Sequence, residues 1–182
     1  SNMLDLFLEL SQVKTSDAMY ILVQLDRRPD PPSTYGGWYD AKRFSVKQGM
    51  LPTAAQALQD LGEINMGSGD TLTNFINWGV ENYPAERYFL IINDHGYAWN
   101  ARSGSSQRAI ARGVSVDHTN GNQYIHNGDL AAAIQAASAK MTIIGLDACE
   151  EAYIEVAYQL RHSGAEIMIA SQEMETNVPG WP

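Results

Sequence analysis

The stretch IIGLDACEEAYIEV (residues 143–156) contains the single cysteine of this 182-residue chain, Cys149. The run from Met141 to Leu146 is apolar and rich in branched side chains, which is typical of a strand buried on both faces. Tyr153, Val156, Ala157 and Leu160 then recur at helical spacing, and Gly164 is placed to end that helix. The cysteine is therefore expected at a corner where a buried strand passes into a helix.

The rest of the chain repeats this alternation. Three more apolar runs have the length of buried strands: Met19–Leu25, Tyr88–Ile92 and Ile167–Ala170. Helical spacing from Leu72 to Tyr83 follows Asp70, a plausible N-cap, and a second helix from Leu130 to Ala137 follows Asn127. Strands that alternate with helices predict an α/β fold with a mainly parallel sheet and helices on its faces.

Two stretches interrupt the alternation and predict hairpins. Residues 26–49 place a Pro- and Gly-rich turn before an alternating strand near Lys42–Gln48. Residues 112–129 centre on Asn120 and Gly121, a pair that favours a type I′ turn. Residues 100–112 are small, polar and basic, and we expect them to form an exposed, flexible loop.

Composition excludes several classes of function. The formal charge of −9 and a pI near 4.7 argue against a nucleic-acid partner, because binding to phosphates needs a basic surface. No apolar run reaches the roughly 18 residues of a membrane span. An acidic protein attracts cationic ligands or peptides instead.

Chemically useful residues follow two of the predicted strands. In open α/β sheets the functional crevice lies beyond the carboxyl ends of the strands. The strand that ends at Ile92 leads to His95, and the strand that ends at Leu146 leads to Cys149. If the two strands are neighbours, these side chains lie at one edge, where an imidazole can take the proton of a nucleophilic thiol. A helix that starts at Cys149 would also favour the thiolate.

The cysteine and the histidines also allow other structural and chemical interpretations. A lone cysteine is often a small buried hydrophobic residue. A phosphatase loop is excluded because Glu155 stands where its arginine belongs, and an EF-hand counted from Asp117 fails at Asn122 and Gly128. A metal-dependent hydrolase using three histidines is a further hypothesis, with the candidate ligands His95, His118 and His126.

Four segments together resemble the clostripain family of cysteine peptidases, relatives of caspases, gingipains and legumain. They are QDLGEINMGSGDTLTNFINWGVENYPAERYFLIINDHG (59–96), RGVSVD (112–117), IIGLDACEEAYIEVAYQLR (143–161) and ASQEMETNVPGWP (170–182). The resemblance implies a caspase-like three-layer α/β/α sandwich with a mainly parallel sheet, and a single peptidase domain over residues 1–182. It also implies a bacterial-type endopeptidase that cuts peptides or proteins after Arg or Lys, with secretion or the cell envelope as its location.

The resemblance assigns roles to particular residues. His95 is similar to the family's general acid and base, Cys149 to its nucleophile, and the N–H groups of Gly96 and Cys149 to its oxyanion hole. Asp147 is similar to the acid that binds the basic residue of the substrate, although it could equally cap the following helix together with Glu150. No cofactor is required by the sequence, and resemblance to some members implies calcium.

The resemblance also predicts self-processing, and the chain differs from the family pattern at its two ends. Several members cut themselves between the histidine and the cysteine, which here predicts cleavage after Arg102 or Arg108. Compared with the family pattern, the chain is expected to be truncated at both ends, with Ser1 and Asn2 as a tag remnant. The alternative function is a catalytically inactive caspase-like domain that binds peptides or partner proteins.

Overall fold

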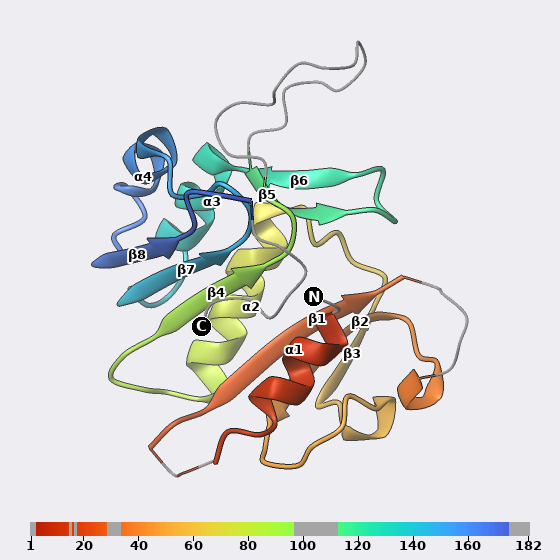
Figure 1. Cartoon of the computed structure of the whole chain (residues 1–182). Coiled ribbons are helices and arrows are strands. Elements are labelled where there is room, and N and C mark those ends of the chain that lie inside the picture. Colours follow the sequence, from red (N-terminus) through yellow and green to blue (C-terminus); the bar gives the residue numbers. More distant parts are fainter. Residues whose placement is uncertain (1–2, 15, 17, 29–33, 97–112, 175–182) are drawn as a thin grey trace. The chain divides into compact units, whose positions relative to one another are not determined.

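The computed structural model describes residues 3–14, 16, 18–28, 34–96 and 113–174. The chain forms two compact units, Ser1–Ile64 and Asn65–Pro182 (Figure 1). The assignment of both to a single peptidase domain stays a prediction.

The first unit is an antiparallel sheet with one α-helix. Its elements are α1 (Met3–Leu10), β1 (Ile21–Arg27), η1 (Thr34–Gly36), β2 (Asp40–Val46), η2 (Ala54–Gln56) and β3 (Gln59–Gly62), with strand order β1-β2-β3. Strand β1 pairs with β2 from Ile21↔Val46 to Arg27↔Asp40, which confirms the predicted hairpin. The apolar run Met19–Leu25 was expected in the parallel sheet, and that expectation is wrong because the Pro- and Gly-rich connection reverses the chain into a hairpin.

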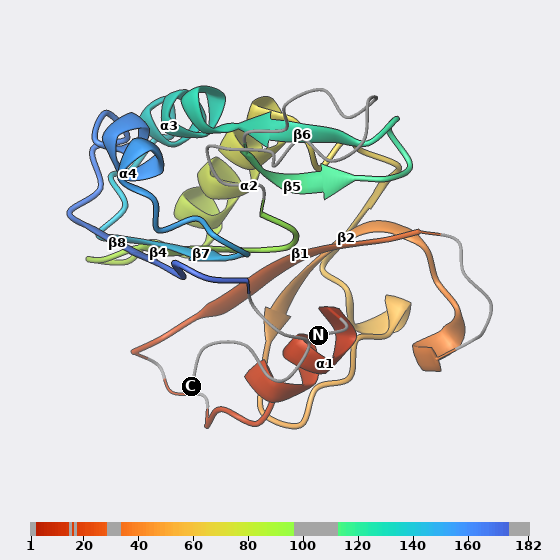
Figure 2. The same cartoon turned by 45° about the horizontal axis from the view of Figure 1, so that its top comes forward.

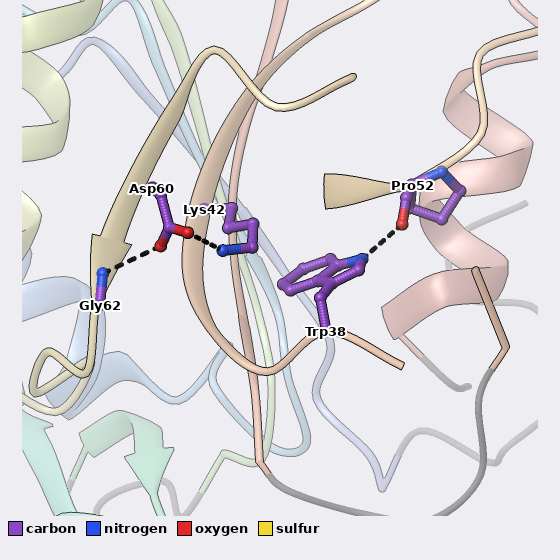
Figure 3. Close-up of polar contacts among 5 residues, drawn as sticks. All are labelled: Trp38, Lys42, Pro52, Asp60 and Gly62. Atoms are coloured by element: carbon purple, nitrogen blue, oxygen red, sulfur yellow. Dashed lines mark hydrogen bonds and ion pairs between the residues drawn. The ribbon is translucent and has the colours of Figure 1, made fainter. Parts of the chain in front are cut away.

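Polar contacts join Lys42, Asp60 and Trp38 to neighbouring segments of this unit (Figure 3). Lys42, which is buried on β2, forms an ion pair with Asp60 on β3 and lies over the ring of Trp38. The hydrogen bond from Lys42 and a second one from the Gly62 N–H lower the pKa of Asp60. Trp38 Nε1 donates to the carbonyl of Pro52 at 2.7 Å. Burying Lys42 is therefore tolerated, because its charge is neutralised across the sheet.

The second unit contains the parallel sheet. Its elements are α2 (Gly69–Asn82), β4 (Phe89–Asn93), β5 (Gly113–Asp117), β6 (Gln123–His126), α3 (Asn127–Gln135), β7 (Ile143–Asp147), α4 (Ile154–Leu160) and β8 (Ile167–Ala170). Strands β4, β7 and β8 are parallel in the order β4-β7-β8, and β5 and β6 form an antiparallel hairpin. The three predicted helices and the three predicted parallel strands of this region are confirmed.

The two faces of the parallel sheet are unequal. Helices α2, α3 and α4 lie on the same face (Figure 2), where they pack against Leu90, Ile92, Ile144 and Leu146 in one apolar core. The alternate side chains point the other way, and Phe89 and Ile91 are 55% and 52% exposed, with Ile167 and Ile169 also exposed. The expectation that β4 and β8 are buried on both faces is therefore wrong, because these three helices cover one face.

The predicted hairpin at residues 112–129 is present with a shifted turn. The Gln123 N–H donates to the carbonyl of Asn120 at 3.4 Å, and the two residues between them, Gly121 and Asn122, have φ of 71° and 58°. The left-handed pair of the turn is thus Gly121–Asn122 rather than Asn120–Gly121, because asparagine tolerates the second position as glycine does the first. The loop at 100–112 lies outside the described residues.

No helix of the described residues is both long enough and apolar enough to cross a bilayer.

Candidate active site

Strand pairing brings two turns to one edge of the sheet: the histidine corner (residues 93–96, after β4) and the cysteine corner (residues 147–152, after β7). Strand β4 runs parallel to β7 in register from Phe89↔Ile143 to Asn93↔Asp147. His95 and Cys149 each stand two residues beyond the last register pair, so both emerge at the carboxyl edge of neighbouring strands. The Asn93 amide donates a hydrogen bond to the Asp147 carboxylate across that last pair.

Gly96 brings the two corners into contact. A Cβ at this position would stand 2.9 Å from the Cys149 nitrogen and still closer to the Cys149 carbonyl oxygen. On its other side Gly96 forms an antiparallel bridge with Val114, at the start of β5. The backbone after His95 is therefore packed between the cysteine and β5, and no larger residue fits there without displacing backbone.

Asp94 fastens the histidine corner to β5. Its carboxylate accepts a hydrogen bond from the Val116 N–H at 2.6 Å and another from the His95 N–H. Burial raises the pKa of Asp94, and these two hydrogen bonds and the nearby imidazoles of His95 and His118 offset only part of that effect. His95 itself is exposed, so its ring is accessible to a substrate.

The cysteine corner differs from the sequence expectation. Helix α4 begins at Ile154, whereas Cys149 lies in a turn directly after β7. The prediction that Cys149 starts the helix is therefore wrong, and the helix dipole does not act directly on its thiol. The cause is Glu150, which takes a left-handed conformation with φ of 59° and sends its N–H to the carbonyl of Glu173 at 3.0 Å.

Asp147 is buried at the end of β7, with 8% exposure. The N-cap of α4 is Tyr153, and it has no side-chain capping bond. The alternative that Asp147 caps this helix is therefore wrong, because the helix starts seven residues later. Its carboxylate is instead held by Asn93, beside the cysteine corner.

The sequence of this chain is similar to those of known proteins. The model of the Clostripain family matches residues 9–182. The chain belongs to the clostripain family. Clostripain from Hathewaya histolytica is 30% identical to it over 118 residues, which is 60% of this chain and 22% of clostripain.

Solved structures of clostripain-family proteins share the fold. An inactive zymogen C11 protease from Parabacteroides distasonis has a TM-score of 0.65 and 21% identity, covering 94% of this chain and 44% of its own. The secreted C11 cysteine protease iotapain from Bacteroides thetaiotaomicron has a TM-score of 0.58 and 22% identity, covering 77% and 40%. The chain thus spans less than half the length of these relatives, and its caspase-like α/β fold class is confirmed.

Sequence reasoning missed the residues that support the two corners. Asp117 accepts hydrogen bonds from the backbone N–H groups of Met66, Thr119 and Asn120 and from two of their side chains. It thereby ties the β5–β6 turn to the segment before α2. The sequence DHTNG (117–121) could have indicated this role of Asp117. An aspartate side chain at the start of a turn often accepts hydrogen bonds from backbone N–H groups two or three residues later.

The three-histidine metal hypothesis does not fit the described structure. The rings of His95 and His118 lie 6.3 Å apart, but His126 stacks on Tyr124 with a centroid distance of 4.6 Å. Among the described residues, these three histidines do not form a group close enough to share an ion. Arg102 and Arg108, the predicted self-cleavage positions, lie outside those residues.

Proposed function

We propose that this clostripain-family chain carries the catalytic site of a cysteine endopeptidase, with Cys149 as nucleophile and His95 as general base. The observation that supports the proposal best is the contact of Gly96 with the Cys149 backbone at the carboxyl edge of two paired strands. This contact puts the residue next to His95 against the nucleophile itself. Cys149 is partly exposed, as a residue that meets substrate must be.

The reaction follows from the chemistry of these groups. The Cys149 sulfur attacks the peptide carbonyl while His95 takes the thiol proton, and the N–H groups of Gly96 and Cys149 stabilise the oxyanion. His95 then gives the proton to the leaving amine as the C–N bond breaks, which leaves a thioester. Water, deprotonated by His95, hydrolyses the thioester and restores the thiol.

Asp147 supplies the proposed preference for Arg or Lys in the substrate. Its carboxylate is buried next to the nucleophile, where an ion pair with guanidinium or ammonium is stronger than in open water. The net charge of −9 attracts such basic substrates over a longer range.

Further properties are proposed on the family resemblance. An active form is proposed to cleave itself after Arg102 or Arg108, and mass spectrometry that shows an intact chain after long incubation of an active sample would contradict this. Secretion agrees with the description of iotapain as secreted. Calcium is proposed as a ligand on the family resemblance alone, and the cleavage steps themselves use only Cys149, His95 and backbone N–H groups.

The experiment uses the natural protein and a fluorogenic arginyl substrate. Turnover is expected in the natural protein and is expected to fall at least about 1,000-fold in Cys149→Ala and in His95→Ala. Iodoacetamide should alkylate Cys149 and stop turnover, whereas chelators should not.

An inactive peptide-binding domain is the alternative, and one structural relative is described as an inactive zymogen. No turnover and no alkylation of Cys149 in the natural protein would favour that alternative. Peptide binding with basic selectivity would then remain as its function.

A further inference from the structure

A second imidazole lies beside the proposed base. The ring of His118 is 6.3 Å from the ring of His95, with an interplanar angle of 69°. His118 belongs to the turn between β5 and β6, far from His95 in sequence, and it is exposed. The cleavage reaction proposed for Cys149 and His95 does not use His118.

The turn holds this imidazole in one orientation. His118 Nδ1 lies 2.7 Å from the amide oxygen of Asn122, so Nδ1 carries the proton and donates it. Asn122 is in turn fixed in the left-handed position of the turn, and Asp117 accepts four hydrogen bonds from Thr119 and Asn120 of the same turn. The ring edge that carries Nε2 is the part left to meet a ligand.

The order of the elements places the proposed base, His95, between the proposed nucleophile, Cys149, and His118. Strand β7 leads into Cys149 and β4 leads into His95, while Gly96 contacts the Cys149 backbone on one side and forms a bridge with Val114 of β5 on the other. In a thiol peptidase the base delivers its proton to the leaving amine, so the part of the peptide after the cut passes the base. That part of the substrate then continues toward His118.

The distance fits a peptide side chain close to the cut. An extended peptide advances roughly 3.3 Å per residue, so 6.3 Å corresponds to about two residues. An imidazole protonates in mildly acidic solution and then pairs with a carboxylate. Among the described residues, the titratable groups near His118 are Asp94 and His95 at the neighbouring corner and Asp117 in its own turn.

We propose that His118 is a specificity-determining residue that binds an acidic side chain, Asp or Glu, at the first or second substrate position after the cut. The inference rests on the proposed peptidase function. Together with the proposed role of Asp147, it describes both sides of the scissile bond. Asp147 binds a basic residue before the bond, and His118 binds an acidic residue after it.

The test compares two kinds of substrate with the natural protein at mildly acidic pH. One is an arginyl peptide with Asp, Gln or Lys at each of the two positions after the cut. The other is an arginyl coumarin amide, which has no residue after the cut. We expect the natural protein to prefer the Asp peptides over the Lys peptides about three- to fivefold, a range set by exposed ion pairs.

His118→Gln is expected to remove this preference and to leave turnover of the coumarin amide within twofold. Asn122→Gly keeps the left-handed turn but removes the anchoring amide, and it should weaken the preference partly. His162→Gln is the matched control, since His162 is an exposed histidine after α4. It should change neither readout.

Two results would overturn the proposal. One is an unchanged Asp-to-Lys ratio in folded His118→Gln; the other is an equal loss on the coumarin amide, which would mean that His118 acts through His95. If the natural protein cleaves nothing, the peptidase proposal fails by itself. Binding of the same peptides to Cys149→Ala, with and without His118→Gln, then decides the role of His118 by affinity.

Discussion

In the corner after β4, the carboxylate of Asp94 and one close glycine contact hold the backbone, whereas in the corner after β7 backbone hydrogen bonds join the turn to the segment after β8. At the first corner Asp94 and Gly96 connect His95 to β5 and to Cys149. At the second, the N–H groups of Glu150 and Ala152 donate to the carbonyls of Glu173 and Ser171. Both corners belong to the same unit and meet at one edge of one sheet.

This difference predicts unequal tolerance to substitution. Backbone hydrogen bonds survive most changes of side chain, so the cysteine corner should keep its path in many sequences. The histidine corner depends on the identity of a few residues, since a side chain at 96 or the loss of the carboxylate acceptor at 94 alters the contact itself. Four substitutions separate these cases.

Gly96→Ala should have the largest effect, because it separates the two corners. The added methyl group meets the Cys149 backbone, and displacement of a reacting group by about 1 Å costs about 100-fold in rate. We expect kcat/KM on an arginyl substrate to fall by about that factor. Gly128→Ala is the control, because a Cβ there meets nothing within 4 Å. Near-normal activity of Gly96→Ala would show that the corners are not in catalytic contact.

Asp147→Asn tests whether the cysteine corner binds the basic residue of the substrate. The amide keeps the size of the side chain but removes its charge, so KM for arginyl and lysyl substrates should rise about 10- to 100-fold, the range for a hydrogen bond between charged groups. Asp129→Asn, on the exposed surface of α3, should leave KM unchanged. A fall in kcat with KM unaltered would assign Asp147 to positioning of the corner instead.

Asp117→Ala tests the support of the β5–β6 turn. Burial alone raises the pKa of Asp117, but the hydrogen bonds from Thr119, Asn120 and Met66 outweigh burial and lower it below its ordinary value. The group therefore stabilises the fold above its unfolded pKa, and this stability is lost as the pH falls through the lower folded pKa. The substitution should cost about 2 kcal/mol at neutral pH.

Denaturant unfolding at neutral and acidic pH measures this effect. The gap between the natural protein and Asp117→Ala should narrow as the pH falls below the ordinary range of an aspartate. A gap that stays constant with pH would mean that the lost stability comes from packing and not from the ionised carboxylate.

Glu150→Gly should have the smallest effect and the opposite sign. The left-handed backbone at Glu150 is strained for a residue with a Cβ, and glycine relieves the strain at some cost in chain entropy. We expect a gain of about 0.5 kcal/mol, seen as a higher Tm. Glu155→Gly, in the first turn of α4, should instead lose about 1 kcal/mol. A lower Tm for Glu150→Gly would show that its side chain stabilises the corner.

The sequence predicted much of the fold because its signals are local. Apolar runs at β4, β7 and β8 and the helical spacing of α2, α3 and α4 depend on near neighbours in the chain, and all six elements are present. The same signal failed for β1, since an apolar run specifies a strand but not the direction of its partner. It failed also for Phe89 and Ile91, whose exposure depends on where the helices pack.

By itself, the sequence determined the order of the elements, the residues at the two corners and the family. Only the tertiary structure decided that Asn93 pairs with Asp147, that Gly96 lies against Cys149 and that His118 stands beside His95. The physical reason is range. Propensity and periodicity act over a few residues, whereas these contacts join segments tens of residues apart and depend on strand register, backbone approach and burial.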